Sequence, residues 1–290
     1  MKTDVGRKDL NKKAIGGLLL LIVSLAMALF IPARTLDYWQ AWVFLALFFV
    51  PVLAITVYLM KNDPDLLERR IRSGPRAEKQ LSQKVTLFTI RLAFGAMIVV
   101  SALDHRFAWS RVPLYMVAAG DVLVAIGLLV GFCVFKANTF ASATIEVADG
   151  QRVISTGPYS LVRHPMYVGI LIMVMGVPLA LGSWWGLLAV VPIKLALVWR
   201  LIDEERFLAK SLPGYAEYRT RVRYRLMPFI WLQIAFVCGL TPVFGVRAGA
   251  RRAPTCFDAK LLVNSPGARG GRSVVTENAE PYRRLAGCLR

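Results

Sequence analysis

Long apolar runs separated by short polar stretches dominate this chain. The runs lie at approximately 14–31, 38–60, 87–103, 112–135, 166–182 and 184–200. At a rise of about 1.5 Å per residue, each run forms a helix of about 25–35 Å, enough to cross the hydrocarbon core of a bilayer. Gly182, Ser183 and Trp184 join the last two runs in a tight hairpin. The pattern therefore predicts an all-α polytopic membrane protein with about six transmembrane helices.

The first run also has features of a secretory signal peptide. Five basic residues precede Ala14, and the run ends near Ile31. However, an apolar signal core is about 7–15 residues long, and no clean small-x-small cleavage site follows this run. We therefore expect a retained transmembrane helix.

Lysine and arginine concentrate on alternate connections between the runs. The N-terminus, the 61–86 loop and the segment after Arg200 are rich in them, and the intervening connections are poor. The positive-inside rule then places the N-terminus, the 136–165 loop and the segment after Arg200 in the cytoplasm. We expect an integral membrane protein whose site faces the cytoplasm.

Composition agrees with this class. Hydrophobic residues make up 56% of the 290 residues, more than in an ordinary soluble domain. The net charge of +18 is interpreted as basic loops beside the membrane, so no nucleic-acid partner is expected. The four cysteines form no C-x-x-C pair and have no neighbouring histidine, so no metal site is predicted. Asp121 lies near the middle of a run, where it is neutral, paired or facing a polar cavity.

A polar motif precedes the fifth run. It consists of Gly157-Pro158-Tyr159 followed by Arg163-His164-Pro165-Met166-Tyr167. The Gly-Pro turn frees backbone N–H groups, and a guanidinium matches a carboxylate or phosphate bidentately. Pro165 suits the first position of a helix, whose N-terminus favours anions. The motif therefore predicts a site for an anionic group.

Two adjacent carboxylates, Glu204 and Glu205, follow the sixth run. They could accept hydrogen bonds from ribose hydroxyls or from an ammonium group. A ligand with a carboxylate at one end and an amine and a ribose elsewhere fits both clusters, and S-adenosylmethionine is one such ligand. Alternatively, Arg163 is a juxtamembrane charge, the tyrosines are interfacial, and the two glutamates form a solvated helix end paired with Arg200 and Arg206.

The combination resembles the isoprenylcysteine carboxyl methyltransferases and their relatives, the membrane phospholipid methyltransferases. The matching elements are the Gly-Pro-Tyr turn, Arg-His-Pro-x-Tyr-x-Gly ending at Gly169, Glu204-Glu205, Tyr215 with Tyr218, and Pro228. The resemblance covers about 136–228. It implies that the C-terminal half binds S-adenosylmethionine at the cytosolic face and that a lipophilic acceptor enters from the bilayer.

The resemblance assigns roles to individual residues. It implies catalytic roles for Arg163 and Glu205. It implies cofactor binding by Gly157, Pro158, Tyr159, Arg163, His164, Pro165, Tyr167, Glu204 and Glu205.

Four regions follow from these patterns. They are a membrane region at 1–135, a cofactor-binding region at 136–228, an apolar interfacial or re-entrant segment at 229–246, and a disordered basic tail at 247–290. Family members usually end soon after the proline aligned with Pro228, so the tail is expected to be dispensable. No Gly-x-Gly-x-Gly loop follows a strand pattern, which disfavours a soluble-type Rossmann methyltransferase.

The predicted function is methyl transfer to a lipophilic acceptor in the membrane, with the carboxylate of an isoprenylcysteine-like compound favoured. The alternatives are a phospholipid N-methyltransferase acting on an amino headgroup, a sterol-reductase-like enzyme using NADPH, and a non-enzymatic transporter or scaffold. Gly-Pro-Tyr and Glu-Glu favour methyl transfer over reduction, and a transporter would need charged or broken helices along a path.

Overall fold

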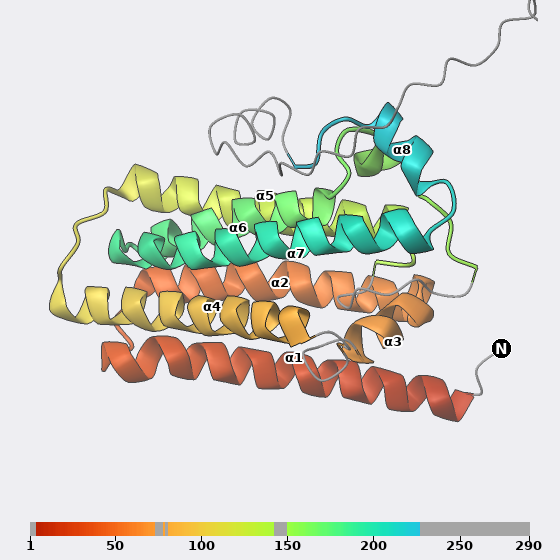
Figure 1. The fold of residues 1–290 in the computed structure, drawn as a ribbon. Helices are drawn as coiled ribbons and strands as arrows, with labels where there is room; N and C mark the ends of the chain where they lie inside the picture. The colour runs from red at the N-terminus through yellow and green to blue at the C-terminus, as the bar shows by residue number, and fades with distance from the viewer. Residues whose placement is uncertain (1–3, 73–77, 79–80, 142–149, 227–290) are drawn as a thin grey trace, which may run out of the picture. The chain divides into compact units, whose positions relative to one another are not determined.

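The computed structural model of the chain describes residues 4–72, 78, 81–141 and 150–226 (Figure 1). The predicted segments at 229–246 and 247–290 lie outside the described residues. The elements are α1 (Asp4–Ala33), α2 (Trp39–Asn62), α3 (Pro64–Arg72), α4 (Leu81–Phe107), α5 (Leu114–Ala137), the 3₁₀ turn η1 (Gly157–Ser160), α6 (Pro165–Ala180), the 3₁₀ turn η2 (Trp185–Ala189), α7 (Val190–Ser211) and α8 (Tyr215–Arg221).

Five helices are long and apolar enough to cross a membrane, so the predicted polytopic membrane class is confirmed. They are α1, α2, α4, α5 and the continuous stretch Trp185–Ser211. The remaining predicted span, the run 166–182, corresponds to α6, which has 16 residues and is about 24 Å long, shorter than the hydrocarbon core. It ends early because Gly182, with a φ of +71°, turns the chain into the hairpin.

The last long helix differs from the sequence prediction at its end. The apolar run stops at Arg200, but α7 continues to Ser211. Hydropathy marks where side chains become polar, and a helix can continue past that point with one face buried. Glu204 and Glu205 therefore lie on the helix itself, Glu205 buried and Glu204 half-buried.

The closest helix pairing joins α5 and α6 through two glycine crossings. A Cβ added to Gly127 would meet the Gly169 carbonyl at 2.6 Å, and a Cβ added to Gly176 would meet the Gly120 carbonyl at 2.6 Å. Small residues of this kind let two membrane helices approach backbone to backbone. The pairing fixes α6, which begins at the Arg-His-Pro motif, against the end of α5.

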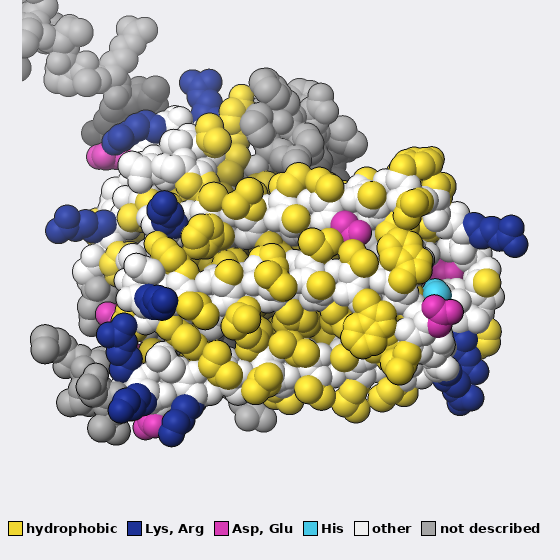
Figure 2. Space-filling view, turned by 180° about the vertical axis from the view of Figure 1, so that it is seen from behind, with side chains coloured by type: hydrophobic (Ala, Val, Ile, Leu, Met, Phe, Trp, Pro, Cys, Tyr) yellow, Lys and Arg dark blue, Asp and Glu magenta, His cyan; other side chains and the backbone are white. Residues whose placement is uncertain are grey.

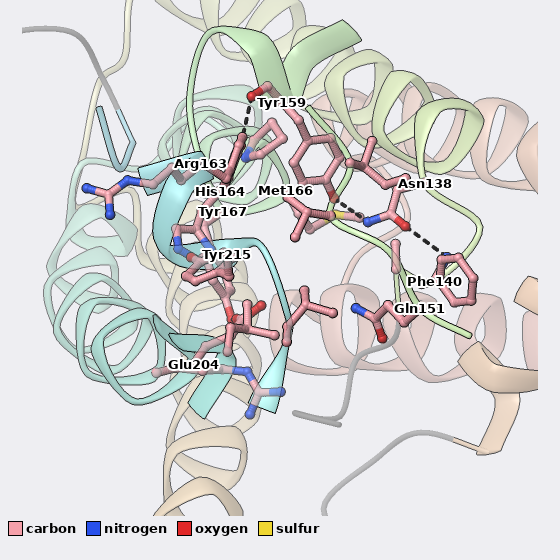
Figure 3. A pocket seen from close by; sticks show the side chains of 18 of the residues that line it. Asn138, Phe140, Gln151, Tyr159, Arg163, His164, Met166, Tyr167, Glu204 and Tyr215 are labelled. Carbon is pink, nitrogen blue, oxygen red and sulfur yellow. Dashed lines mark hydrogen bonds between the residues drawn. The ribbon is translucent and has the colours of Figure 1, made fainter. Parts of the chain in front are cut away.

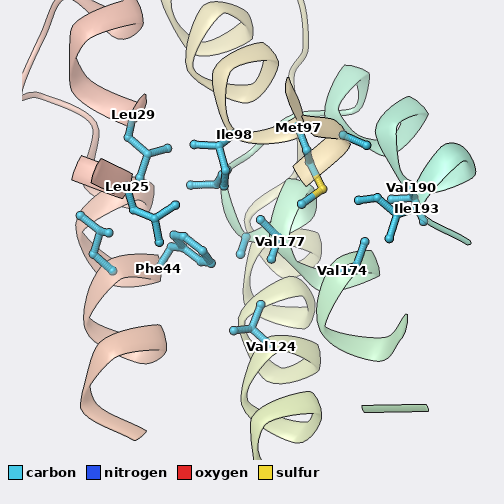
Figure 4. Close-up of a cluster of buried hydrophobic side chains, with 14 of the residues drawn as sticks. Leu25, Leu29, Phe44, Met97, Ile98, Val124, Val174, Val177, Val190 and Ile193 are labelled. Carbon is cyan, nitrogen blue, oxygen red and sulfur yellow. The ribbon is translucent and has the colours of Figure 1, made fainter. Parts of the chain in front are cut away.

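One apolar core joins all six long helices (Figure 4). Leu25 and Leu29 of α1, Phe44 of α2, and Met97 and Ile98 of α4 pack in it. It also includes Val124 of α5, Val174 and Val177 of α6, and Val190 and Ile193 of α7. The pairings α1–α4, α4–α7, α2–α5 and α5–α6 arrange the helices side by side, so loops meet at two ends.

Polar side chains fasten the end that carries the 34–38, 108–113 and 181–184 turns, here called the far end. The buried Asp104 carboxylate accepts hydrogen bonds from the Ser183 hydroxyl at 2.5 Å and from the Ser110 hydroxyl at 2.6 Å. Tyr38 donates to the Leu181 carbonyl at 2.6 Å. These bonds join the three turns to one another.

The opposite end, here called the site end, carries the 138–164 and 212–226 segments. Figure 2 shows apolar side chains along the helices and lysine and arginine gathered mainly at one end. The orientation predicted from loop charge stays a prediction.

Candidate functional site

A cavity of about 260 Å³ lies at the site end, where the start of α6 meets α4, α7, α8 and the segment that follows α5. Figure 3 shows its lining side chains, which come from segments far apart in the sequence. Six of the residues predicted from the motifs line it: Tyr159, Arg163, His164, Pro165, Tyr167 and Glu204. Gly157, Pro158 and Glu205 do not line it.

The turn before α6 positions Tyr159. Gly157 has a φ of +59°, a conformation that favours glycine, and η1 follows it. The Asn138 amide donates to the Tyr159 hydroxyl at 3.0 Å, and the Tyr218 hydroxyl donates to the Tyr159 carbonyl at 2.7 Å. Burial raises the pKa of Tyr159 to about 12, so its hydroxyl stays protonated at neutral pH. This turn is therefore fixed to both α5 and α8.

The segment beyond α8 pairs with the Arg-His-Pro motif through the backbone. Arg163 N–H donates to the Tyr224 carbonyl at 2.9 Å, and His164 N–H donates to the Arg225 carbonyl at 3.0 Å. The Arg163 side chain also donates to the Arg223 carbonyl at 3.1 Å. Residues 223–225 thus form the outer support of the motif.

Glu205 is the centre of a buried charge cluster. Its Oε1 lies 2.7 Å from Arg163 Nη1 and 3.4 Å from His164 Nε2, and its Oε2 accepts a hydrogen bond from Arg225 Nε at 2.8 Å. The Glu205 side chain is 4% exposed. Burial lowers the pKa of Arg163, and the Glu205 charge opposes that shift. Glu205 therefore holds the motif in place from behind the cavity.

Glu204, the neighbouring carboxylate on α7, lines the cavity. Its carboxylate accepts a hydrogen bond from the Tyr167 hydroxyl at 2.5 Å. Adjacent residues on a helix point about 100° apart, so two neighbouring carboxylates reach different surroundings. The interpretation as a solvated pair with Arg200 and Arg206 is wrong for Glu205, which is buried against Arg163 and Arg225. Arg206 pairs with Asp203 at 3.7 Å.

Arg200 lines the cavity and belongs to a hydrogen-bond network that was not predicted from the sequence. Its guanidinium donates to Gln83 Oε1 at 2.8 Å and to Glu78 Oε1 at 3.0 Å. Gln83 in turn donates to Asp203 at 2.7 Å. The network links α4, α7 and residue 78. No motif marks Gln83 or Glu78, because a contact across more than a hundred residues leaves no local pattern.

Three buried polar atoms on cavity-lining residues lack a hydrogen-bond partner among the described residues. They are Arg163 Nε, His164 Nε2 and the Tyr215 hydroxyl. Buried polar groups are ordinarily paired, so such atoms indicate a place where a polar ligand binds. Asp121 Oδ1 also lacks a hydrogen-bond partner among the described residues, but Asp121 does not line this cavity.

The region that contains the cavity residues of α6 and α7 is similar to a known protein family. Residues 115–213, from α5 to just beyond α7, match the family model described as phospholipid methyltransferase. Over these residues the chain is similar to the phospholipid methyltransferase family. The resemblance predicted from the Gly-Pro-Tyr and Arg-His-Pro motifs is thereby confirmed.

Curated relatives match over shorter parts. The chain is 30% identical over 102 residues to the cobalt-zinc-cadmium resistance protein CzcN of Cupriavidus metallidurans, which covers 34% of this chain and 47% of that protein. It is 29% identical over 128 residues to a Delta(14)-sterol reductase of Mus musculus, covering 38% of this chain and 31% of that protein. The match thus spans less than half of either relative.

Proposed function

We propose that the protein transfers a methyl group from S-adenosylmethionine to a lipophilic acceptor resident in the membrane. The observation that carries the proposal is the cavity at the start of α6, whose walls come largely from the segment of the phospholipid methyltransferase family. Arg163 and His164 line it, and a guanidinium and an imidazole both suit an anionic group. Tyr215 and Glu204 supply an unpaired hydroxyl and a carboxylate for hydroxyl and ammonium groups.

The residues of the cavity then divide the work. Arg163 and His164 hold the carboxylate end of the cofactor, and Glu205 and Arg225 keep these two side chains in position. Tyr167 orients the Glu204 carboxylate through its hydrogen bond. In the reaction that S-adenosylmethionine supplies, the acceptor atom bonds to the methyl carbon while the carbon–sulfur bond breaks and its electron pair stays on sulfur. Positioning of the two reactants contributes much of the rate in such an in-line displacement.

The favoured acceptor is the carboxylate of an isoprenylcysteine-like compound. A carboxylate is ionised at neutral pH and needs no base. An amino headgroup must first lose a proton, and Glu204, which lines the cavity, is the candidate base for that alternative.

An assay with methyl-labelled S-adenosylmethionine separates these functions. Purified protein in lipid nanodiscs is given N-acetyl-S-farnesylcysteine or phosphatidylethanolamine, and saturable cofactor binding is measured in parallel. We expect a base-labile methyl ester from the farnesylcysteine compound. A base-stable methylated phospholipid supports the amine alternative, and absence of cofactor binding overturns the proposal.

The similarity to a sterol reductase makes a reductase the second candidate. It predicts saturable binding of NADPH in place of S-adenosylmethionine. The same nanodisc sample, titrated with each cofactor, decides between the two.

A further inference from the structure

Two charged side chains of opposite sign lie along the membrane helices, away from the polar ends. Asp121 on α5 is half-buried, and Lys194 on α7 is exposed. Figure 2 shows how sparse charge is along the middle of the helices. A charge at this depth in a bilayer is costly, so such residues usually pair with an opposite charge or face water. Neither residue lines the cavity at the site end, so the proposed reaction does not explain them.

Within one copy of the chain, both side chains lack an opposite charge among the described residues. Neither forms a hydrogen bond or an ion pair with another described residue, and the Asp121 Oδ1 atom is buried without a partner. Buried acceptors are ordinarily satisfied, and an unpaired charge in surroundings of low dielectric constant is unfavourable. A partner for each is therefore sought beyond the described part of the chain.

Asp121 and Lys194 lie at similar depths measured from the far end. Asp121 is seven residues beyond Leu114, the first residue of α5, which corresponds to about 10 Å along the helix. Lys194 is nine residues beyond Trp185, where the last candidate span begins, which corresponds to about 14–16 Å. The flexible four-carbon stem of lysine spans a difference of this size. The two charges are thus matched in depth as well as in sign.

The helix faces that carry these charges are open to a neighbouring molecule. On α5, Ala118 and Ala125 lie one turn on either side of Asp121, and both are exposed. Small side chains allow another membrane helix to approach closely. On α7, Val191 and Leu195 beside Lys194 are 57% and 65% exposed. Each charge is therefore surrounded by apolar surface that a second helix can cover.

We propose that two copies of this protein associate in the membrane through an ion pair between Asp121 of one copy and Lys194 of the other. Copies inserted with the same orientation present each residue at the same depth, so the match within one chain becomes a match between chains. An unrelated membrane protein would need its own charge at this depth. This inference does not depend on the reaction that the cavity supports.

Association is measured by energy transfer between donor-labelled and acceptor-labelled full-length protein in lipid vesicles, while the lipid content is increased stepwise. We expect the native protein to associate. Asp121→Asn and Lys194→Gln should each weaken association by about tenfold or more, because a close ion pair in apolar surroundings is lost.

Arg91→Gln is the matched control for the loss of a membrane charge. Arg91 is an exposed basic residue of α4 that also has no partner among the described residues. However, it lies sixteen residues, or about 24 Å, from the far end of that helix, near the opposite boundary of a hydrocarbon core about 30 Å thick. Because this depth differs from that of Asp121, the Arg91→Gln variant should keep the native association.

Mixing the two variants distinguishes an intermolecular pair from a loss of folded protein. Asp121→Asn protein still carries Lys194, and Lys194→Gln protein still carries Asp121, so an intact pair can form between them. We expect the mixture to associate about threefold or more tightly than either variant alone. Native protein that does not associate, or a mixture no tighter than the separate variants, overturns the proposal.

Disulfide formation in membranes tests the geometry of the contact. Asp121→Cys and Lys194→Cys are placed on separate, differently tagged copies, after replacement by serine of the native cysteines Cys133, Cys238, Cys256 and Cys288. We expect an oxidant to join the two tags, whereas Asp121→Cys combined with Arg91→Cys should give no such product. Equal cross-linking by the control pair, or cross-links from Asp121→Cys to a different protein alone, contradicts self-association.

Discussion

Adjacent glutamates on α7 have opposite tasks in this site. Glu205 is surrounded by Arg163, His164 and Arg225, whereas Glu204 lines the cavity and accepts from Tyr167. The sequence pair Glu-Glu therefore combines one carboxylate that holds the site together with one that is open to a ligand.

Neutralising the two glutamates should separate these tasks. Glu205→Gln removes the carboxylate charge that pairs with the buried Arg163 side chain, and breaking a buried ion pair typically costs about 3–5 kcal/mol. We expect a lower thermal midpoint together with weaker S-adenosylmethionine binding. Glu204→Gln should keep a near-native midpoint and lose cofactor affinity. Thermal unfolding and cofactor titration of both variants in nanodiscs provide the measurement, and equal midpoints would contradict the division.

The two tyrosines of α8, Tyr215 and Tyr218, also differ in their hydrogen bonds. Tyr218 donates to the Tyr159 carbonyl, whereas the buried Tyr215 hydroxyl has no partner among the described residues. Tyr215→Phe should leave stability unchanged or raised and weaken cofactor binding by about 0.5–1.5 kcal/mol, the value of one hydrogen bond. Tyr218→Phe should lower stability by a similar amount. If Tyr215→Phe binds the cofactor as the native protein does, its hydroxyl has no ligand role.

Sequence reasoning found the residues that are close together in the chain. Tyr159, Arg163, His164, Pro165, Tyr167 and Glu204 all line one cavity, as expected from the motifs. It could not find Arg225, Gln83 or Arg70, because each reaches the site through the packing of another element. In a loop with several arginines, the sequence does not indicate which of them is buried.

At the scale of elements, hydropathy located the helices well and their ends less well. The apolar runs coincide with α1, α2, α4, α5, α6 and α7, since an apolar face must be buried or face lipid. The short α3 was not predicted, because nine residues with five charges of mixed sign have the composition of a loop. The helix is amphipathic, and its own Leu66 and Leu67 are buried in a small apolar cluster with residues of α1 and α2.

The glycine crossings between α5 and α6 predict a strong local response. Gly127→Val would push a side chain into the Gly169 carbonyl and force the helices apart. Overpacking of this kind costs about 1–3 kcal/mol, so we expect a lower thermal midpoint and reduced folded yield. Gly95→Val, at a position with open space, serves as the control. Size-exclusion profiles and unfolding curves of both variants test this, and equal loss in the two would refute the packing role.

At the scale of the whole molecule, the site and the polar far end lie at opposite ends of the membrane helices. Loop charge predicts that the site end faces the cytoplasm. Its basic residues include Arg69, Arg70 and Arg72 on α3 and Arg219 and Arg221 on α8.

Labelling of single cysteines in intact cells tests this orientation. Ser160→Cys at the site end and Arg111→Cys at the far end are introduced after replacement of Cys133, Cys238, Cys256 and Cys288 by serine. Both positions are exposed. An impermeant maleimide added outside should label the Arg111→Cys protein and spare the Ser160→Cys protein until the membrane is opened. The reverse pattern would place the cavity on the outer side.

The backbone pairing of residues 163–164 with 224–225 sets an order for biosynthesis. Arg225 and the carbonyls that support the motif lie beyond α7, the last of the candidate spans among the described residues, so the ribosome makes them after those spans. Glu205 is therefore synthesised before Arg225, the second arginine that pairs with it. Among the described residues, the site end of the protein is therefore assembled last, and a chain interrupted before residue 225 would lack part of the support of the Arg-His-Pro motif.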